Sequence, residues 1–182
     1  MAAVLDRPTS NVGVTLDEFL TSDVYGDGDE LMFGMVWPEM PEGPTHSLRT
    51  EALRNLFAAR SDGRWVGHEV ALQIVGASQP RPDVVVFRET FETYLRRDAF
   101  DARDAEAVIE VSLSTHDRDY GPKDLLYAQA GIPEYVIVDL KNRAVEVRTE
   151  PSARGYLRRA PLGPGDVYRG VSFEDLLGPV GT

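Results

Sequence analysis

Three short runs rich in valine and isoleucine, at residues 83–87, 108–113 and 134–139, constrain the fold of this chain more than any other feature. Each run has the length and the β-branched content of a buried strand. A helical pattern over residues 122–130 lies between the last two runs, and it begins at Pro122. Proline suits the first helical position because its missing N–H would have no partner there. The sequence therefore predicts an α/β fold around a mixed sheet.

The remaining patterns predict two further helices with capping residues and one short helix at the end of the chain. Thr15 is expected to cap a helix over residues 16–21, and Thr45 a longer one over residues 46–60. The closing helix is expected over residues 173–177.

Additional strands are expected around this core, with Gly34 marking a bend in the first of them. Residues 88–104 are charged and fit either a helix around residues 91–97 or a surface loop. The expected strands cover residues 30–36, 65–70, 72–75, 144–149 and 155–160.

The length of 182 residues is enough for one domain with a substantial core. Residues 1–14 have no periodic pattern and are interpreted as a loose lead-in, and residues 15–182 as a single domain. No apolar run approaches the roughly 20 residues of a membrane span. The N-terminus has no basic leader followed by an apolar stretch, so we expect a cytoplasmic protein. The absence of cysteine excludes disulfides, thiolate metal sites and cysteine nucleophiles.

The acidic balance argues against a broad basic surface for nucleic acid. The net charge is −11, of which residues 1–44 carry −8 and residues 45–182 carry only −3. A nucleic-acid-binding domain usually carries a basic patch or stripe. Because the acidic excess is concentrated near the N-terminus, the body of the chain is nearly neutral, which weakens this argument without removing it.

Two carboxylates occur within the predicted buried strands. Asp83 follows Pro82 at the first position of its strand, where proline is tolerated because it need not donate to the ladder. Glu110 interrupts an apolar run, and a buried carboxylate there costs several kcal/mol unless it meets a cation or hydrogen-bond donors. The simpler interpretations are a strand-entry turn for Asp83 and an edge-strand position facing water for Glu110.

Lys123 is one of only two lysines, the other being Lys141, among 19 basic residues. Lys123 shares a helical face with Leu126 and Tyr127, so it is expected to overhang the sheet at the start of the helix. A compact ammonium can contact one phosphate oxygen or one water. The simpler interpretation is a surface lysine.

Together, the three residues suggest a metal-assisted phosphodiesterase. Asp83 and Glu110 on adjacent strands offer hard oxygen ligands for Mg²⁺ or Mn²⁺. Such an ion lowers the pKa of a bound water and neutralises charge on a phosphate. Lys123 is then placed to orient the water or to stabilise the transition state.

The chain resembles the PD-(D/E)XK nuclease superfamily and, within it, the small bacterial Uma-two family of restriction-type endonucleases. The resemblance covers roughly residues 15–177, and its most specific part is Gly131-Ile132-Pro133-Glu134-Tyr135 together with Asp119-x-x-x-Lys123. The segments that carry it are Pro82-Asp83, residues 109–115, Asp119-x-x-x-Lys123, residues 126–139 and, earlier in the chain, residues 30–34 with His46.

The resemblance implies a restriction-endonuclease-like mixed β-sheet core flanked by helices, and a Mg²⁺-dependent endonuclease acting on DNA. Asp83 and Glu110 match the metal-binding acids, and Lys123 matches the lysine. Glu30 is carried over as an additional acid and His46 as a phosphate or water contact, for which an exposed surface histidine is the equal alternative. The resemblance also implies a homodimer, since two sites are needed to cut both strands.

The chain departs from the simplest superfamily motif, because the E-x-K lysine position holds Ser112. The Uma-two pattern places the lysine on the next helix instead, where Lys123 lies directly after Pro122.

Two other functions remain open from the sequence. One is a catalytically silent relative that binds nucleic acid or a partner protein, which the acidic charge favours and the intact acids and lysine oppose. The other is a metal-free hydrolase with a carboxylate pair, as in glycosidases; the lysine argues against it. Nothing in the sequence specifies a base sequence or distinguishes DNA from RNA.

Overall fold

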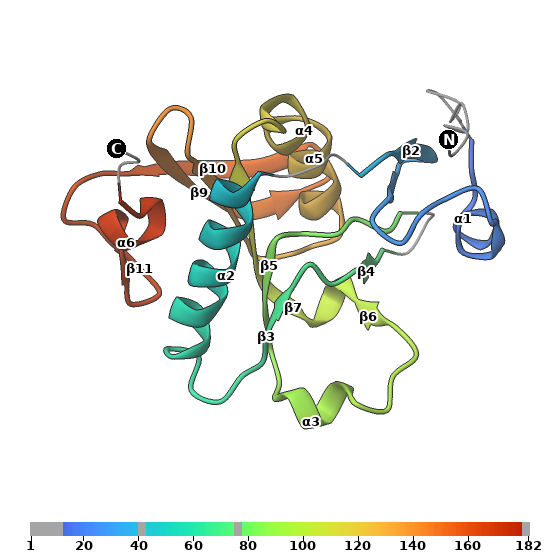
Figure 1. Cartoon of the computed structure of the whole chain (residues 1–182), viewed down its shortest axis with the longest axis horizontal. Helices are drawn as coiled ribbons and strands as arrows, with labels where there is room; N and C mark the ends of the chain where they lie inside the picture. The colour runs from blue at the N-terminus through green and yellow to red at the C-terminus, as the bar shows by residue number, and fades with distance from the viewer. Residues whose placement is uncertain (1–12, 40–42, 75–77, 180–182) are drawn as a thin grey trace.

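The computed structural model describes residues 13–39, 43–74 and 78–179, and its core is a six-stranded mixed sheet (Figure 1). The strand order is β10-β9-β8-β7-β5-β3. Only β7 and β8 pair in parallel, and the other neighbours are antiparallel. The strands are β3 (Val66–His68), β5 (Val84–Phe87), β7 (Ala105–Ser112), β8 (Glu134–Asp139), β9 (Ala144–Ser152) and β10 (Gly155–Leu162). The α/β fold with a mixed sheet is thus confirmed.

The parallel pair β7–β8 requires a crossover, which two short helices provide. These are α4 (His116–Tyr120) and α5 (Pro122–Gln129). One apolar cluster joins α5 to one face of the sheet through Leu126, Tyr127 and Tyr135. Because both faces are covered, β7 and β8 are almost entirely buried, which explains why they appear in the sequence as continuous apolar runs.

The opposite face of the sheet is covered by α2 (Pro44–Ala58) and α6 (Phe173–Leu177). The sequence placed the first of these helices over residues 46–60 with Thr45 as its cap, and this was wrong by about one half-turn. Gly43 is the N-cap and Pro44 occupies the first helical turn, because proline starts a helix without losing a hydrogen bond. The closing helix has the predicted bounds.

The N-terminal part of the structure is a helix followed by a hairpin. Helix α1 (Leu16–Thr21) is capped by Thr15, as predicted, and Glu18 completes a capping box. Strands β1 (Glu30–Met32) and β2 (Met35–Trp37) are joined by a tight turn at Phe33 and Gly34, both with positive φ. Residues 30–36, predicted as a strand or hairpin arm with a bend at Gly34, thus form a hairpin that turns at Phe33 and Gly34.

The lead-in predicted for residues 1–14 falls largely on residues 1–12, which lie outside the described residues. The backbone N–H groups of Gly13 and Val14 donate hydrogen bonds to the Gly34 carbonyl, at 2.8 and 3.0 Å. The two residues that precede the first helix are thus held against the hairpin.

Several short elements differ from the sequence prediction. Of the two alternatives for residues 88–104, the helix is confirmed in part, since α3 (Phe91–Tyr94) begins where it was expected and ends three residues earlier. It is followed by β6 (Phe100–Asp101) and a 3₁₀ turn (Ala102–Asp104), which were not predicted. Strand β6 pairs in parallel with β4 (Leu72–Gln73). The small hairpin of β11 (Val167–Tyr168) and β12 (Val171–Ser172) was not predicted. Residue 75, predicted as a strand end, lies outside the described residues.

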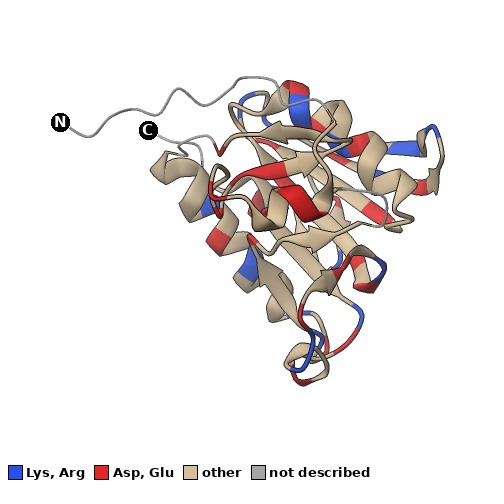
Figure 2. Cartoon of the chain, turned by 90° about the vertical axis from the view of Figure 1, so that its right-hand side faces the viewer, with Lys and Arg blue, Asp and Glu red and all other residues tan. Residues whose placement is uncertain are grey.

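The surface is unevenly charged. Figure 2 looks onto the end of the molecule that carries α1 and β2 and shows acidic segments, drawn red, near the middle of this face. In the part of the chain that the structure describes, no helix has the length and apolar content needed to cross a membrane.

Candidate active site

Asp83 and Glu110 lie opposite each other at the junction of β5 and β7. The antiparallel register pairs Val84 with Ile109, so the next pair outward is Asp83 with Glu110. Alternation along each strand puts both carboxylates on the face that α5 covers. Both residues are buried, with 7% and 2% of their surface exposed. The interpretation of Glu110 as a water-facing edge residue is therefore wrong. Asp83 does occupy a bend directly before β5, as the strand-entry interpretation had it, but its carboxylate is buried in the cluster.

Asp83 is held as a carboxylate by two donors on one oxygen. The Val111 backbone N–H donates to Asp83 Oδ2 at 2.6 Å, and His46 Nε2 lies 3.3 Å from the same oxygen. Burial alone would raise the pKa of Asp83, but the hydrogen bond and charge of His46, with Lys123 and the Val111 N–H, keep this pKa below its usual value. His46 is itself only 5% exposed, so its interpretation as a surface histidine is wrong.

Glu110 contacts Lys123, which reaches back from the first turn of α5. Lys123 Nζ lies 2.8 Å from Glu110 Oε1, and the Tyr127 hydroxyl donates to the same oxygen at 2.7 Å. Burial raises the pKa of Glu110 well above its usual value, the charge of Lys123 opposes this, and the charges of Asp83, Asp119 and Glu30 add to it. The raised pKa of Glu110 thus reflects its burial first and the neighbouring carboxylates second.

The Lys123 ammonium is buried, and only 2% of the residue is exposed, so its interpretation as a surface lysine is wrong. Burial would lower its pKa, but the charges of Glu110, Glu30 and Asp119 raise it far above the usual value. Lys123 therefore stays protonated at the first turn of α5, where the sequence pattern predicted that it would overhang the sheet.

Glu30, from the N-terminal hairpin, completes the anionic cluster. Its Oε1 lies 3.2 Å from Lys123 Nζ and accepts the Arg81 backbone N–H at 2.8 Å. Its Oε2 forms an ion pair with Arg118 Nη1 at 3.0 Å. The structure thus brings together all five residues that the sequence analysis singled out: Glu30, His46, Asp83, Glu110 and Lys123.

Three residues of the cluster were not assigned by the sequence analysis. Asp119 is 1% exposed, accepts a hydrogen bond from Thr115 Oγ1 at 2.5 Å, and has a pKa raised mainly by burial. Arg118 is paired with Glu30, as described above. Of these three residues, Tyr127 could most easily have been predicted from the sequence. It lies one helical turn after Lys123, and a buried tyrosine hydroxyl usually has a hydrogen-bond partner.

A polar cavity of about 240 Å³ is lined by part of this cluster, namely Glu30, Asp83, Arg118 and Lys123. Two further acidic residues, Glu39 and Glu69, also line it. The cavity therefore presents charges of both signs, since its basic lining residues are Arg81, Arg118 and Lys123. A phosphate accompanied by a cation requires such a lining.

The donor set fits a divalent cation held by few protein ligands. Among the described residues, no three histidine or acidic side chains are arranged to hold a metal ion by themselves. In the described part of the chain, four buried acidic residues, Glu30, Asp83, Glu110 and Asp119, nevertheless lie around two cations that pair with them, Lys123 and Arg118. Mg²⁺ commonly keeps several waters and takes one or two carboxylates plus substrate phosphate, so the opposed pair Asp83 and Glu110 meets its requirement.

The fold is that of a restriction-endonuclease-like α/β protein. A crystal structure of a protein from Anabaena variabilis ATCC 29413, described as "a putative nuclease belonging to DUF820", superposes on this chain with a TM-score of 0.66 at 18% sequence identity. The match covers 90% of this chain and 97% of that one. At this level of identity, the likeness establishes the fold.

A match to a family model identifies the family within this fold class. The chain matches the Uma2 family, whose description is "Putative restriction endonuclease", over residues 26–177. The match covers most of the chain, so this protein belongs to the Uma2 family, as the sequence motifs indicated. No curated protein matches the chain.

Proposed function

We propose that this protein is a divalent-metal-dependent endonuclease that hydrolyses phosphodiester bonds of DNA. The observation that carries the proposal is the buried cluster in which Asp83 and Glu110 lie opposite each other with Lys123 beside them. Family membership supports the same class of reaction. A buried group of carboxylates with too few cations is costly for folding alone and is understandable where a metal ion binds.

Asp83 and Glu110 are the residues that would hold Mg²⁺ or Mn²⁺, which supplies charge neutralisation at the phosphate and lowers the pKa of a bound water. Asp83 is ready for this role, because its lowered pKa keeps it ionised. The two hydrogen bonds on Glu110 both fall on Oε1. They fix the orientation of the carboxylate through one oxygen.

Lys123 is proposed to act at the phosphate. Its raised pKa keeps it cationic, so it serves as a fixed positive charge and hydrogen-bond donor rather than as a general base. At 2.8 Å from Glu110 and 3.2 Å from Glu30, the ammonium is held at a defined point on the cavity wall. A preorganised charge of this kind stabilises the extra negative charge of the transition state without reorganisation.

His46 and Glu30 are proposed as positioning residues. His46 holds the Asp83 carboxylate through Nε2, which is a more specific role than a direct phosphate contact. Glu30 holds Lys123 and Arg118 with its two oxygens. Loss of either residue is expected to misplace a group that acts on the substrate.

One observation favours a second candidate function, a catalytically silent protein that binds nucleic acid or a partner. The net charge is −11, and Glu39 and Glu69 line the polar cavity, so long duplexes gain little from counterion release. The metal-free hydrolase is less favoured, because the buried Lys123 ammonium lies 2.8 Å from Glu110, and a carboxylate pair of the glycosidase type does not require such a cation.

The test is a cleavage assay on supercoiled plasmid and on single-stranded DNA, with Mg²⁺, Mn²⁺ or EDTA. The proposal predicts metal-dependent cleavage that Lys123→Ala abolishes and that the exposed-arginine control Arg158→Gln leaves intact. Cleavage in EDTA would contradict metal dependence, and binding without cleavage under every metal condition would support the silent protein.

Two further parts of the proposal concern assembly and location. A homodimer is proposed because a single site cuts one strand and two sites are needed for both. A cytoplasmic location is proposed because a nuclease must share a compartment with its DNA. Analytical ultracentrifugation tests the first and fractionation of the source cells the second.

A further inference from the structure

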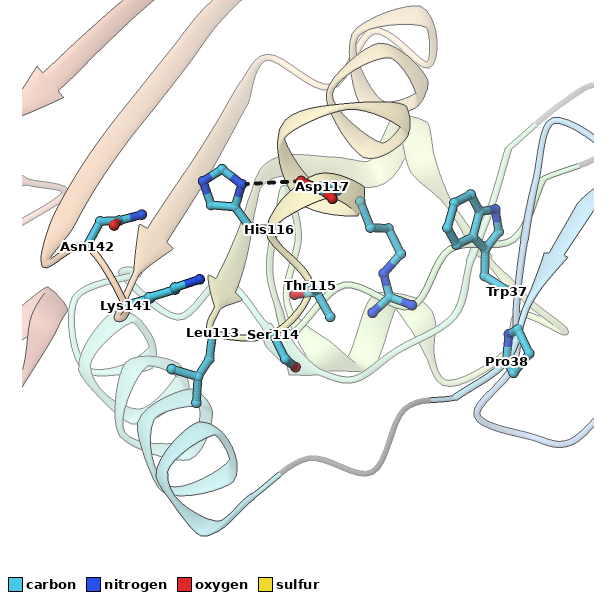
Figure 3. A pocket seen from close by; sticks show the side chains of 10 residues that line it. Trp37, Pro38, Leu113, Ser114, Thr115, His116, Asp117, Lys141 and Asn142 are labelled. Atoms are coloured by element: carbon cyan, nitrogen blue, oxygen red, sulfur yellow. Dashed lines mark ion pairs between the residues drawn. The ribbon is translucent and has the colours of Figure 1, made fainter. Parts of the chain in front are cut away.

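A second and larger cavity, of about 560 Å³, lies beside the candidate active site. The two cavities share Arg118. Figure 3 shows Trp37 and Pro38 on one side of the larger cavity and Lys141 and Asn142, from the turn after β8, on the other. A ligand that spans both cavities must therefore pass Arg118.

The lining of this cavity combines flat apolar surface with donors that are free to bind a ligand. Trp37 is only partly buried, and it packs against the apolar core while it lines the cavity. Lys141 is exposed and, among the described residues, makes no ion pair. Arg118 Nε is buried and donates to no acceptor in the described part of the chain, although its Nη1 is paired with Glu30. A buried donor without an acceptor is unfavourable unless a ligand or water supplies one.

We propose that this cavity holds the base and sugar of an unpaired nucleotide adjacent to the scissile phosphate, so that the substrate is single-stranded or locally unpaired nucleic acid. This inference rests on the proposed nuclease function, and it adds the form of substrate that the site accepts.

The size and chemistry of the cavity suit a nucleotide. Its volume lies within the range of about 300–1,000 Å³ typical of small-molecule sites. The indole of Trp37 offers a stacking surface that accepts any base. Asn142 already donates through its backbone N–H and its Nδ2 to Asp139, which fixes the side chain and leaves its amide oxygen as an acceptor for a base edge.

An unpaired strand is required for two reasons. A base stacked within a duplex can reach the cavity between Trp37 and Lys141 only if it leaves the helix, which costs least where the base is already unpaired. The acidic balance of the chain also disfavours a long duplex, which must be neutralised at many phosphates. A short strand that meets Lys141, Arg118 and Lys123 needs only these few cations.

Arg118 places the nucleotide next to the reaction. Its side chain lines both cavities, and its Nη1 is anchored by Glu30, which also holds Lys123. A backbone phosphate at the boundary would accept a hydrogen bond from the unpartnered Nε. The following phosphate would then lie toward Asp83 and Lys123.

The test is a binding measurement in EDTA, which needs no catalysis. The full-length protein is titrated into a fluorescein-labelled single-stranded oligonucleotide and into a blunt duplex of the same sequence, with anisotropy as the readout. The variants are Trp37→Leu and Lys141→Gln, and Arg158→Gln on the exposed side of β10 is a charge-matched control that does not line the cavity. Circular dichroism checks the fold of Trp37→Leu, because Trp37 also packs on the core.

We expect the single strand to bind about tenfold or more tightly than the duplex. Loss of a stacking partner is expected to weaken single-strand binding by about 5- to 100-fold in Trp37→Leu. Lys141→Gln should weaken it by less and reduce its salt dependence, whereas the control should match the wild type. Equal affinity for both substrates, or variants that bind like the control, would overturn the inference.

The outcomes separate this inference from the function on which it rests. Selective single-strand binding that needs Trp37, without cleavage in any metal, would support the nucleotide cavity and refute the nuclease. Metal-dependent cleavage of blunt duplex that is insensitive to Trp37→Leu and Lys141→Gln would support the nuclease and overturn the cavity's role.

Discussion

Replacing Lys123 by methionine removes the buried cation of the candidate site while keeping most of the side-chain volume. Lys123 Nζ lies 2.8 Å from Glu110 Oε1 and 3.2 Å from Glu30 Oε1. At an effective dielectric constant of about 20, each contact is worth about 5–6 kcal/mol of Coulomb energy. Desolvation of the three ions cancels much of this, so we expect Lys123→Met to lower the free energy of unfolding by about 3–5 kcal/mol in EDTA.

The loss of unfolding free energy in Lys123→Met should be smaller at low pH than at high pH. Burial and the charges of Asp83, Asp119 and Glu30 raise the pKa of Glu110, and the variant lacks the ammonium that opposes them. A carboxyl whose folded-state pKa lies above its unfolded value contributes stability below the unfolded pKa and loses it as pH rises through the folded pKa. The deficit of Lys123→Met relative to wild type is therefore smaller at about pH 5 than at about pH 8.

Urea unfolding followed by tryptophan fluorescence measures this deficit at both pH values. Lys141→Met is the matched control, because it removes the other lysine from an exposed position. Adding Glu110→Gln to Lys123→Met removes the uncompensated carboxylate and should restore about 1–3 kcal/mol. A deficit that is the same at both pH values, or no recovery in the double variant, would refute the reasoning.

Three further predictions follow from the same geometry. Asp83→Ala and Glu110→Ala should each abolish Mg²⁺ binding in calorimetry, whereas Lys123→Ala should still bind Mg²⁺ but no longer cleave DNA. Unchanged Mg²⁺ affinity in both carboxylate variants would refute the assignment of these residues as metal ligands. Mg²⁺ affinity of the wild type should rise with pH, because the raised pKa of Glu110 means that the metal competes with a proton at acid pH; a flat profile across the neutral range would contradict this. Tyr127→Phe deletes the 2.7 Å hydrogen bond to Glu110 and should cost about 1.5–3 kcal/mol by thermal or urea unfolding, with a cost near zero as the contrary result.

The sequence predicted the elements whose patterns are local. Helices α1 and α6 and strand β8 have the predicted bounds, because caps and apolar runs mark them directly. Helix α5 ends one residue earlier than predicted. Helix α4 was missed, since its five residues are mostly charged and show no apolar period.

Tertiary context decided the other differences. The cap at Thr45 was displaced by Pro44, which provides an alternative helix start that propensity alone does not rank. Strand β4 lies within the strand predicted over residues 72–75, but the two-residue strands β6, β11 and β12 exist only through their pairing partners. No local pattern indicates such pairs.

The residues of the candidate site could be predicted from the sequence, but the contacts between them could not. The buried-run position of Glu110 and the helical offset of Lys123 indicated that both would meet at the sheet. The pairing of Arg118 with Glu30 depends on how the N-terminal hairpin folds over α4 and α5, which no spacing in the sequence reveals. The same holds for the contact between His46 on α2 and Asp83 before β5.

The central claim is that Asp83 and Glu110 hold the metal ion on which cleavage depends. The most direct measurement is the anomalous scattering of Mn²⁺ in crystals of the protein grown with this ion. We expect one principal peak within about 2.0–2.3 Å of carboxylate oxygens from both Asp83 and Glu110. A peak bound instead by Glu39 and Glu69, or no peak in protein that cleaves DNA under the same conditions, would contradict it.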